Sequence, residues 1–160
     1  MQKRILPFIL SVLYFIFIFS LSSCDPDRVY EKNIEITDAV WDQQEKASFE
    51  VTISDTITPH NFYVNVRNAD SYPYSNMYMF ITTVFPDQKF SRDTLECILA
   101  DETGKWLGNG AGDIWDNQIL FKRGVRFPAT GKYVFTMEQA MRIDRLPFIM
   151  DVGLRIEKQK

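Results

Sequence analysis

Few side chains in this sequence could carry out catalytic chemistry. His60 is the one histidine, and it follows Pro59 between two expected strands, where we predict a solvated loop. A Ser–His–Asp or Cys–His arrangement would need this residue, yet no Gly-x-Ser-x-Gly motif accompanies it. One histidine and two cysteines also cannot form the clusters that bind transition metals. The sequence therefore predicts no enzyme, no metal site and no cofactor.

Acidic residues offer two weaker possibilities. Pairs of carboxylates could hydrolyse a glycosidic bond, but a chain with 21 acidic side chains contains such pairs by chance. The stretch 101–113 combines acids, Asn109 and glycines, as calcium loops do, but it lacks the Asp-x-Asp-x-Asp-Gly spacing and contains Lys105. Its glycines are better explained by a long hairpin or bulge that needs positive φ.

Four aromatic residues are candidates for contact with a protein partner or a glycan. Tyr72 and Tyr74 flank Pro73 just before an expected strand, which makes a rigid aromatic edge. Trp106 and Trp115 flank the glycines of the 101–113 loop and could present flat faces to a sugar ring. The alternative is that both tryptophans pack against the body of the domain. Coplanar rings that face solvent would favour the glycan, and buried rings would disfavour it.

The N-terminus holds the clearest chemical signal. A short positive start precedes an apolar run, residues 5–21, which ends in Leu21-Ser22-Ser23-Cys24. These features define a secretory signal, and a cysteine directly after Leu-Ser-Ser is the lipobox arrangement of bacterial lipoproteins. We predict a signal peptide over 1–23, cleaved before Cys24, whose sulfur receives a diacylglyceryl group. The alternative is a transmembrane helix, for which residues 5–21 are barely long enough.

The remaining composition excludes several kinds of partner. The chain carries 18 basic and 21 acidic side chains, a net charge of −3, and has no basic run. Binding to nucleic acid is therefore not expected, nor is electrostatic binding to anionic lipid, and no small molecule is indicated. With Cys24 acylated, Cys97 is the remaining thiol, so no intrachain disulfide can form. Its register with Leu95 and Leu99 predicts a buried small hydrophobe.

Alternating apolar and polar residues predict an all-β domain. Residues 24–46 are expected to hold the lipidated N-terminus, a short tether and a first strand near 29–36, with Ala39–Trp41 docked on the body. From residue 47 the period is two almost throughout, with turn-forming residues between the strands. This pattern is typical of an antiparallel β-sandwich, of jelly-roll or immunoglobulin-like type, over 47–160. The expected strands are 49–53, 62–66, 77–85, 94–100, 114–121, 132–137 and 148–156.

Three local expectations accompany this fold. Residues 137–146 are the one helical candidate after the signal, as one or two turns that cross between the sheets. Arg67 and Arg142 are expected to pair with carboxylates for structural reasons. In the last strand, one face is expected to carry Phe148, Met150, Val152, Leu154 and Ile156.

Two short motifs match a modification signal. Asp55-Thr56-Ile57 and Asp93-Thr94-Leu95 have the Asp-Ser/Thr-aliphatic form of O-glycosylation sites on exported proteins of the Bacteroidota. We therefore expect Thr56 and Thr94 as possible O-glycosylation sites, although threonine is common in strands and both motifs can arise by chance.

Several further motifs run in order through nearly the whole mature chain. They are Arg28-Val29-Tyr30-Glu31, Tyr72-Pro73-Tyr74-Ser75-Asn76, Asp93-Thr94-Leu95-Glu96-Cys97, Leu99-Ala100-Asp101, Gly104-Lys105-Trp106-Leu107-Gly108, Gly131-Lys132-Tyr133-Val134-Phe135, Gln139-Ala140-Met141-Arg142 and the segment 151–158. In this order and spacing the sequence resembles the gliding-motility-associated lipoprotein GldH family of the Bacteroidota. The resemblance implies a lipid-anchored envelope protein tied to gliding and type IX secretion machinery, with no catalytic residues to carry over.

The expected function is thus a non-enzymatic, structural or accessory lipoprotein, held by acyl chains to the cell envelope at the outer membrane and in contact with other envelope proteins. The alternative is a glycan-binding accessory lipoprotein of the outer membrane, for which Tyr72, Tyr74, Trp106 and Trp115 are the candidate residues.

Replacing Cys24 by alanine removes the sulfur that we expect to be acylated. The Cys24→Ala variant should fail to incorporate labelled palmitate, and it should stay uncleaved or become soluble. Metabolic labelling of both proteins, followed by fractionation of the cells, measures this. Equal labelling of the two proteins would contradict the lipoprotein prediction.

Overall fold

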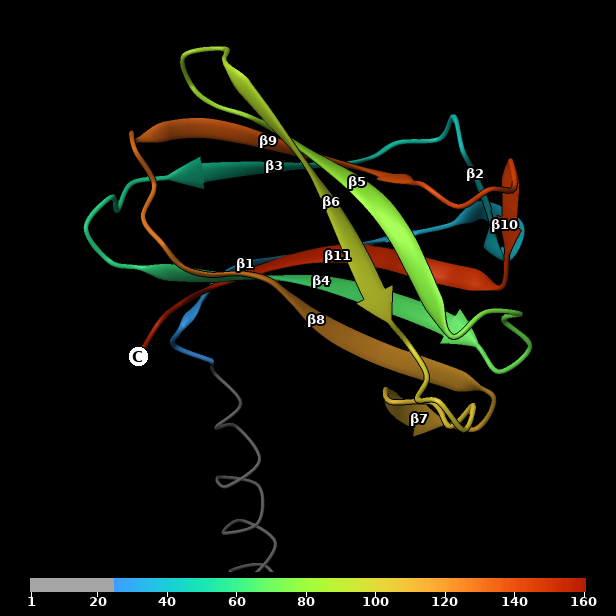
Figure 1. The fold of residues 1–160 in the computed structure, drawn as a ribbon. Coiled ribbons are helices and arrows are strands. Elements are labelled where there is room, and N and C mark those ends of the chain that lie inside the picture. Colours follow the sequence, from blue (N-terminus) through green and yellow to red (C-terminus); the bar gives the residue numbers. More distant parts are fainter. Residues whose placement is uncertain (1–24) are drawn as a thin grey trace, which may run out of the picture.

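Two antiparallel β-sheets pack face to face, as the alternating sequence predicts (Figure 1). The computed structural model describes residues 25–160, so the predicted signal peptide and Cys24 lie outside the described residues. One sheet has the strand order β1-β11-β4-β8-β7 and the other has the order β3-β9-β5-β6, while β10 and β2 form a separate short pair. The strands are β1 (Arg28–Glu35), β2 (Val40–Asp42), β3 (Ala47–Ile53), β4 (His60–Ala69), β5 (Asn76–Val84), β6 (Phe90–Ile98), β7 (Asn109–Ala111), β8 (Ile114–Val125), β9 (Gly131–Gln139), β10 (Arg145–Pro147) and β11 (Ile149–Lys158).

The core lies between the sheets because each strand turns every second side chain inward. β3 buries alternate residues from Ala47 to Ile53 and exposes those between them. β4 has the same period, and its Phe62 ring lies 5.8 Å from the Phe135 ring of the opposite sheet. Full burial of one such side chain contributes roughly 1.5–3 kcal/mol to folding. The expected first strand is confirmed as β1, and Trp41 is fully buried, as its predicted docking requires.

His60 is buried, so the prediction of a solvated loop histidine is wrong. β4 begins at His60, which therefore has the same inward register as Phe62. Its ring packs edge-on against Phe127, with centroids 5.1 Å apart. Its Nδ1 atom has no hydrogen-bond partner among the described residues, and burial lowers the pKa of this imidazole. The strand begins two residues earlier than the sequence pattern indicated.

Residues 137–146 form no helix, contrary to the sequence prediction. β9 continues to Gln139, and the chain then turns back to form β10, which pairs with β2. The buried Gln139 amide forms hydrogen bonds with backbone groups of this turn: its Oε1 accepts the Met141 N–H (2.8 Å), and its Nε2 donates to the Ile143 carbonyl oxygen (2.9 Å). One buried amide thus replaces the backbone hydrogen bonds that a helix would supply.

The inward face of β11 also differs from the prediction at its start. The register with β4 shifts between Ile149 and Asp151, so one extra residue is accommodated there. Ile149 is consequently buried, Met150 is half-buried, and Phe148 is exposed with a φ of 65°. From Val152 onward the expected face is confirmed.

The sandwich has two ends at which different connections gather (Figure 1). At the N-terminal end, the Lys158 N–H donates to the Asp27 carbonyl oxygen (2.8 Å). In the pairing of β11 with β4, Lys158 lies opposite His60, the first residue of β4. The far end holds the connection after Ala69, together with residues 99–113 and 140–148. Within residues 25–160, no helix has the length and apolar character needed to cross a membrane.

Arg155 of β11 clamps the chain at the N-terminal end. Its guanidinium, with a side chain 14% exposed, donates to Asp25, to Glu31 Oε2 (2.8 Å) and to Glu157 Oε2 (3.0 Å). Burial alone would lower the pKa of Arg155, but the hydrogen bonds that it donates to Asp25 and Glu157 raise it. Because Asp25 directly follows Cys24, the chain is already held to the sheets one residue after the expected acylation site.

Truncating a buried aromatic at the centre of the core should destabilise the fold strongly. Phe135→Ala should lower the free energy of unfolding by about 3–5 kcal/mol, because it leaves a cavity beneath Phe62. Phe148→Ala removes the same side chain from an exposed position and should change stability by less than about 0.5 kcal/mol. Denaturant unfolding of residues 25–160 measures both, and equal costs would contradict the assignment of the core.

Candidate functional site

The four aromatic residues predicted from the sequence meet at the far end. Tyr72 packs against Tyr74, with ring centroids 5.7 Å apart, and against Trp106 at 6.4 Å. Trp106 and Trp115 are stacked at 6.5 Å with an angle of 30° between their planes. Three separate segments supply these rings: the β4–β5 connection, the loop before β7, and β8. We refer to Tyr72, Tyr74, Trp106 and Trp115 as the aromatic cluster.

Asp70 organises the aromatic cluster, and sequence reasoning did not identify it. Its Oδ1 atom accepts the indole N–H of Trp106 at 2.8 Å and that of Trp115 at 3.1 Å. Its own backbone N–H donates to the Asp113 carbonyl oxygen at 2.8 Å. The Asp70 carboxylate thus orients both tryptophans, and the Asp70 backbone ties the β4–β5 connection to the β7–β8 turn.

The members of the aromatic cluster differ in exposure. Tyr72 is buried, its hydroxyl donates to the Asn76 carbonyl oxygen (3.0 Å), and burial raises the pKa of this phenol. Both tryptophans are half-buried, whereas Tyr74 is 37% exposed. The cluster is therefore not a coplanar, solvent-facing platform, since three of its rings are buried or half-buried and its two indole planes are inclined by 30°. Tyr74 is the member best placed to meet a partner.

The glycines around this loop have two separate roles. Gly104 and Gly112 adopt positive φ angles of 84° and 68°, as the sequence predicts. At Gly110, by contrast, an added Cβ would lie 2.5 Å from Cζ3 of Trp115, so the glycine leaves room for the indole ring. The aromatic packing therefore depends on the absence of a side chain at this position.

Tyr74 also borders a groove of about 470 Å³, which we call the far-end groove. It is lined by Tyr74, Asn76, Tyr78 and residues 140–143. The turn after β9 forms one wall, and the Tyr78 N–H contacts the Met141 sulfur at 3.3 Å. Five of the eight exposed large hydrophobic residues of the described chain lie at the far end: Tyr74, Tyr78, Ile98, Leu107 and Phe148. Sequence reasoning missed the groove because the turn was expected to be helical.

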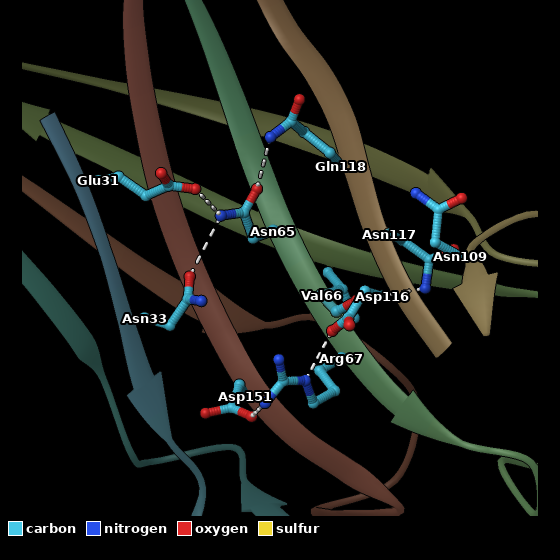
Figure 2. A pocket seen from close by; sticks show the side chains of 10 residues that line it. All are labelled: Glu31, Asn33, Asn65, Val66, Arg67, Asn109, Asp116, Asn117, Gln118 and Asp151. Atoms are coloured by element: carbon cyan, nitrogen blue, oxygen red, sulfur yellow. Dashed lines mark hydrogen bonds and ion pairs between the residues drawn. The ribbon is translucent and has the colours of Figure 1, made fainter. Parts of the chain in front are cut away.

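A second feature is a polar hollow of about 290 Å³ on the outward face of the five-stranded sheet (Figure 2). Asn65 of β4 lies at its centre and donates through Nδ2 to Asn33 Oδ1 (3.2 Å) and Glu31 Oε1 (3.3 Å). Gln118 Nε2 in turn donates to Asn65 Oδ1 (3.5 Å). Gly153 separates Asn33 from Asn65 in the sheet, and an added Cβ there would lie 1.8 Å from Asn33 Oδ1. The missing side chain lets Asn33 reach across β11.

Arg67 forms the other wall of the polar hollow, between two carboxylates. Its Nε donates to Asp116 Oδ1 (2.6 Å) and its Nη1 to Asp151 Oδ2 (3.2 Å), as Figure 2 shows. The bond to Asp116 raises the pKa of Arg67. This confirms the carboxylate pairing expected for Arg67. Arg142 forms no ion pair with any residue of the 25–160 range, so the same expectation is not met there.

The other residues singled out from the sequence lie apart from these features. Cys97 is fully buried, and burial raises the pKa of its thiol to about 12, which confirms its assignment as a small hydrophobe. Thr94 is exposed on β6, an edge strand, and Thr56 is half-exposed in the β3–β4 connection. Among residues 25–160, no three His, Cys, Asp or Glu side chains are grouped as metal ligands would be.

Known proteins match almost the whole chain. Residues 28–156 fit the family described as GldH lipoprotein. The sequence is 38% identical over 154 residues to "Gliding motility lipoprotein GldH homolog" of Christiangramia forsetii, which covers 90% of this chain and 94% of that protein. It is 32% identical over 146 residues to "Gliding motility lipoprotein GldH" of Flavobacterium johnsoniae, which covers 87% and 90%. The chain belongs to the GldH lipoprotein family.

Membership of the GldH family confirms the resemblance seen in the sequence and makes the protein a lipid-anchored lipoprotein of the cell envelope.

Among solved structures, a family GH115 4-O-methyl-α-glucuronidase superposes with a TM-score of 0.44 and 8% identity, over 86% of this chain and 18% of the glucuronidase. A likeness this low supports no argument about fold or function.

Removing the Asp70 carboxylate should loosen the aromatic cluster of this GldH-family protein. Asp70→Ala leaves two indole N–H groups without their acceptor, so the free energy of unfolding should fall by about 1–2 kcal/mol. Acrylamide should then quench tryptophan fluorescence more strongly. Glu102→Ala removes an exposed acid from the same region and should change neither property. Unchanged quenching in Asp70→Ala would show that Asp70 does not orient the tryptophans.

Proposed function

We propose that this protein is a non-enzymatic subunit of an envelope assembly associated with gliding motility and type IX secretion. Acyl chains on Cys24 hold its N-terminal end to the outer membrane, and its far end docks to another protein of that assembly. The observation that carries the proposal is the position of the exposed apolar residues Tyr74, Tyr78, Ile98, Leu107 and Phe148 at the end opposite to Asp25.

The far-end groove suits a protein partner. Protein interfaces combine exposed aromatic residues with a shaped surface, and a few central side chains carry most of the binding energy. Tyr74 and Tyr78 border the groove, and each can bury an aromatic ring while its hydroxyl stays at a polar rim. Arg142, which is exposed on the opposite wall, adds a charged group at that rim. The buried Tyr72 ring packs against Tyr74 and holds it in place, which lowers the entropy cost of binding.

Glycan binding remains the second candidate function, but at the polar hollow rather than at the tryptophans. Amide groups of Asn33, Asn65 and Gln118 follow one another across the sheet, and Arg67 lies beside them between two carboxylates. The amide groups can donate to and accept from neighbouring hydroxyls of a sugar, and the guanidinium can donate to them. In the aromatic cluster, by contrast, the two indole N–H groups can only donate, and both donate to Asp70.

Truncating the two groove tyrosines should break the assembly without unfolding the domain. In pull-downs of the acylated protein from solubilised envelopes, Tyr74→Ala and Tyr78→Ala should each weaken retention of the partner about thirty-fold, the effect of losing about 2 kcal/mol. Asn65→Ala, which alters the polar hollow, is the matched control and should retain the partner. In a gliding source organism, the tyrosine variants should also reduce colony spreading.

The opposite pattern would favour the second candidate. Loss of binding to an envelope polysaccharide in Asn65→Ala, together with unchanged partner retention in both tyrosine variants, would assign the function to the polar hollow. Turnover of a glycan or ester by the purified protein would contradict both candidates.

A further inference from the structure

The two most exposed large apolar side chains of the described chain are not at the far end. Ile57, in the β3–β4 connection, is 81% exposed, and Phe90, at the start of β6, is 71% exposed. Val29 of β1 is the third exposed apolar residue that lies away from the far end. Folded proteins rarely leave side chains of this size so open without a use for them, particularly when they gather in one region.

Contacts around the sandwich place all three residues at the N-terminal end. Pro26, Val29 and Asp55 line one shallow pocket, which puts the first described residues beside the β3–β4 connection. The Arg126 Nε atom donates to the Ile57 carbonyl oxygen at 2.8 Å, which joins this connection to the segment after β8. That segment continues to Pro128, which lines a further pocket together with Phe90. Figure 1 shows these connections on the side of the molecule where the C-terminus lies.

The backbone that presents Ile57 is held firmly. Asp55 Oδ1 accepts the N–H groups of Ile57 (2.9 Å) and Thr58 (3.0 Å). Hydrogen bonding from the Thr58 side chain, together with these two N–H groups, lowers the pKa of Asp55 to about 2. Together with the Arg126 bond, these contacts fix both sides of the Ile57 peptide. The side chain therefore points outward from an ordered turn, and little ordering is left to occur on binding.

We propose that the N-terminal end lies on the lipid bilayer, with Ile57 and Phe90 inserted among the acyl chains. This inference rests on the proposed acylation of Cys24. Arg155 clamps Asp25 to the sheets, and one further residue extends the chain by at most about 3.6 Å. Acyl chains attached there enter the membrane directly beside this end, so the domain cannot move far from the surface. The bilayer is thus the partner that this end meets first and at the highest local concentration.

The charges at this end indicate apolar rather than electrostatic contact. Three lysines nearby are already paired with acids: Lys89 with Asp87 (2.9 Å), Lys132 with Glu50 (2.7 Å) and Lys160 with Asp27 (2.7 Å). Arg126 and Lys158 also lie at this end and belong to no ion pair of residues 25–160, but acids such as Asp55 lie among them. Mixed charges of this kind give little attraction to anionic headgroups. Lipid contact should therefore depend on the apolar side chains, with little effect of anionic lipid content or of salt.

The orientation has a consequence for the modification expected at Thr56. This residue immediately precedes Ile57, so a glycan attached to it would lie in the headgroup region and obstruct insertion. Contact of Ile57 with the bilayer and O-glycosylation of Thr56 are therefore mutually exclusive, whereas Thr94 is unaffected.

Depth-dependent fluorescence quenching tests the orientation. Acylated full-length protein is reconstituted into phosphatidylcholine vesicles whose acyl chains carry bromine near the headgroup, and into matched vesicles without bromine. Ile57→Trp and Phe90→Trp each add a tryptophan at the proposed contact, and Leu107→Trp adds one at an exposed position of the far end. The native Trp41, Trp106 and Trp115 are common to all variants and serve as the background.

The added fluorescence of Ile57→Trp and Phe90→Trp should fall at least two-fold in brominated vesicles, and that of Leu107→Trp should not change. Replacing a third of the lipid by phosphatidylglycerol should leave this pattern intact. Equal quenching of all three variants, or none at positions 57 and 90, would overturn the proposed orientation. The intact mass of the same samples reports acylation separately: an unacylated protein contradicts the proposed function, whereas an acylated protein without quenching contradicts only this inference.

Discussion

The ion-pair cluster around Arg155 determines how the domain is joined to its anchor. One half-enclosed guanidinium holds Asp25, Glu31 and Glu157 at once, and so connects the first described residue, the edge strand β1 and the last strand. A single exposed ion pair would contribute little, but several acids around one arginine form a network with a defined geometry. Because this network acts next to Cys24, it decides which end of the sandwich faces the proposed site of lipid attachment.

The surface separates polar side chains in the middle of the sheets from exposed apolar side chains at the two ends of the sandwich. Outward side chains in the middle of the five-stranded sheet are polar, as around Asn65 and Arg67. The large exposed apolar residues instead occupy connections and strand termini at the two ends. Each sheet turns one face toward the core, so the ends are the places where apolar side chains can project without disturbing that core. A protein that contacts lipid at one end and protein at the other is consistent with this division.

The sequence predicted most of the strands because a half-buried strand must alternate. β3 and β4 follow that rule with almost no exception, and their core faces were correctly assigned. The errors occur where a polar residue is buried or where the register shifts. Gln139 completes a turn that the pattern of Ala140, Met141 and Ile143 made look helical. His60 begins β4 and points into the core, although its imidazole is polar.

The candidate site was predictable only in part. Tyr74 and the two tryptophans were identifiable by type, but their convergence on Asp70 depends on long-range strand pairing that one sequence does not reveal. The polar hollow was missed for the same reason, since Asn33, Asn65 and Gln118 become neighbours only through the order β1-β11-β4-β8.

The length of β4 gives the protein a fixed height. Its ten residues run from the N-terminal end to the far end, and at about 3.3 Å per residue they span roughly 33 Å. With the N-terminal end held at a bilayer, the far-end groove would stand at that height above the headgroups. The domain could tilt only as much as the Arg155 clamp permits. Such a domain would act as a spacer. It can engage a partner that offers its binding surface at that level, and it would fail to reach one that lies flat on the membrane.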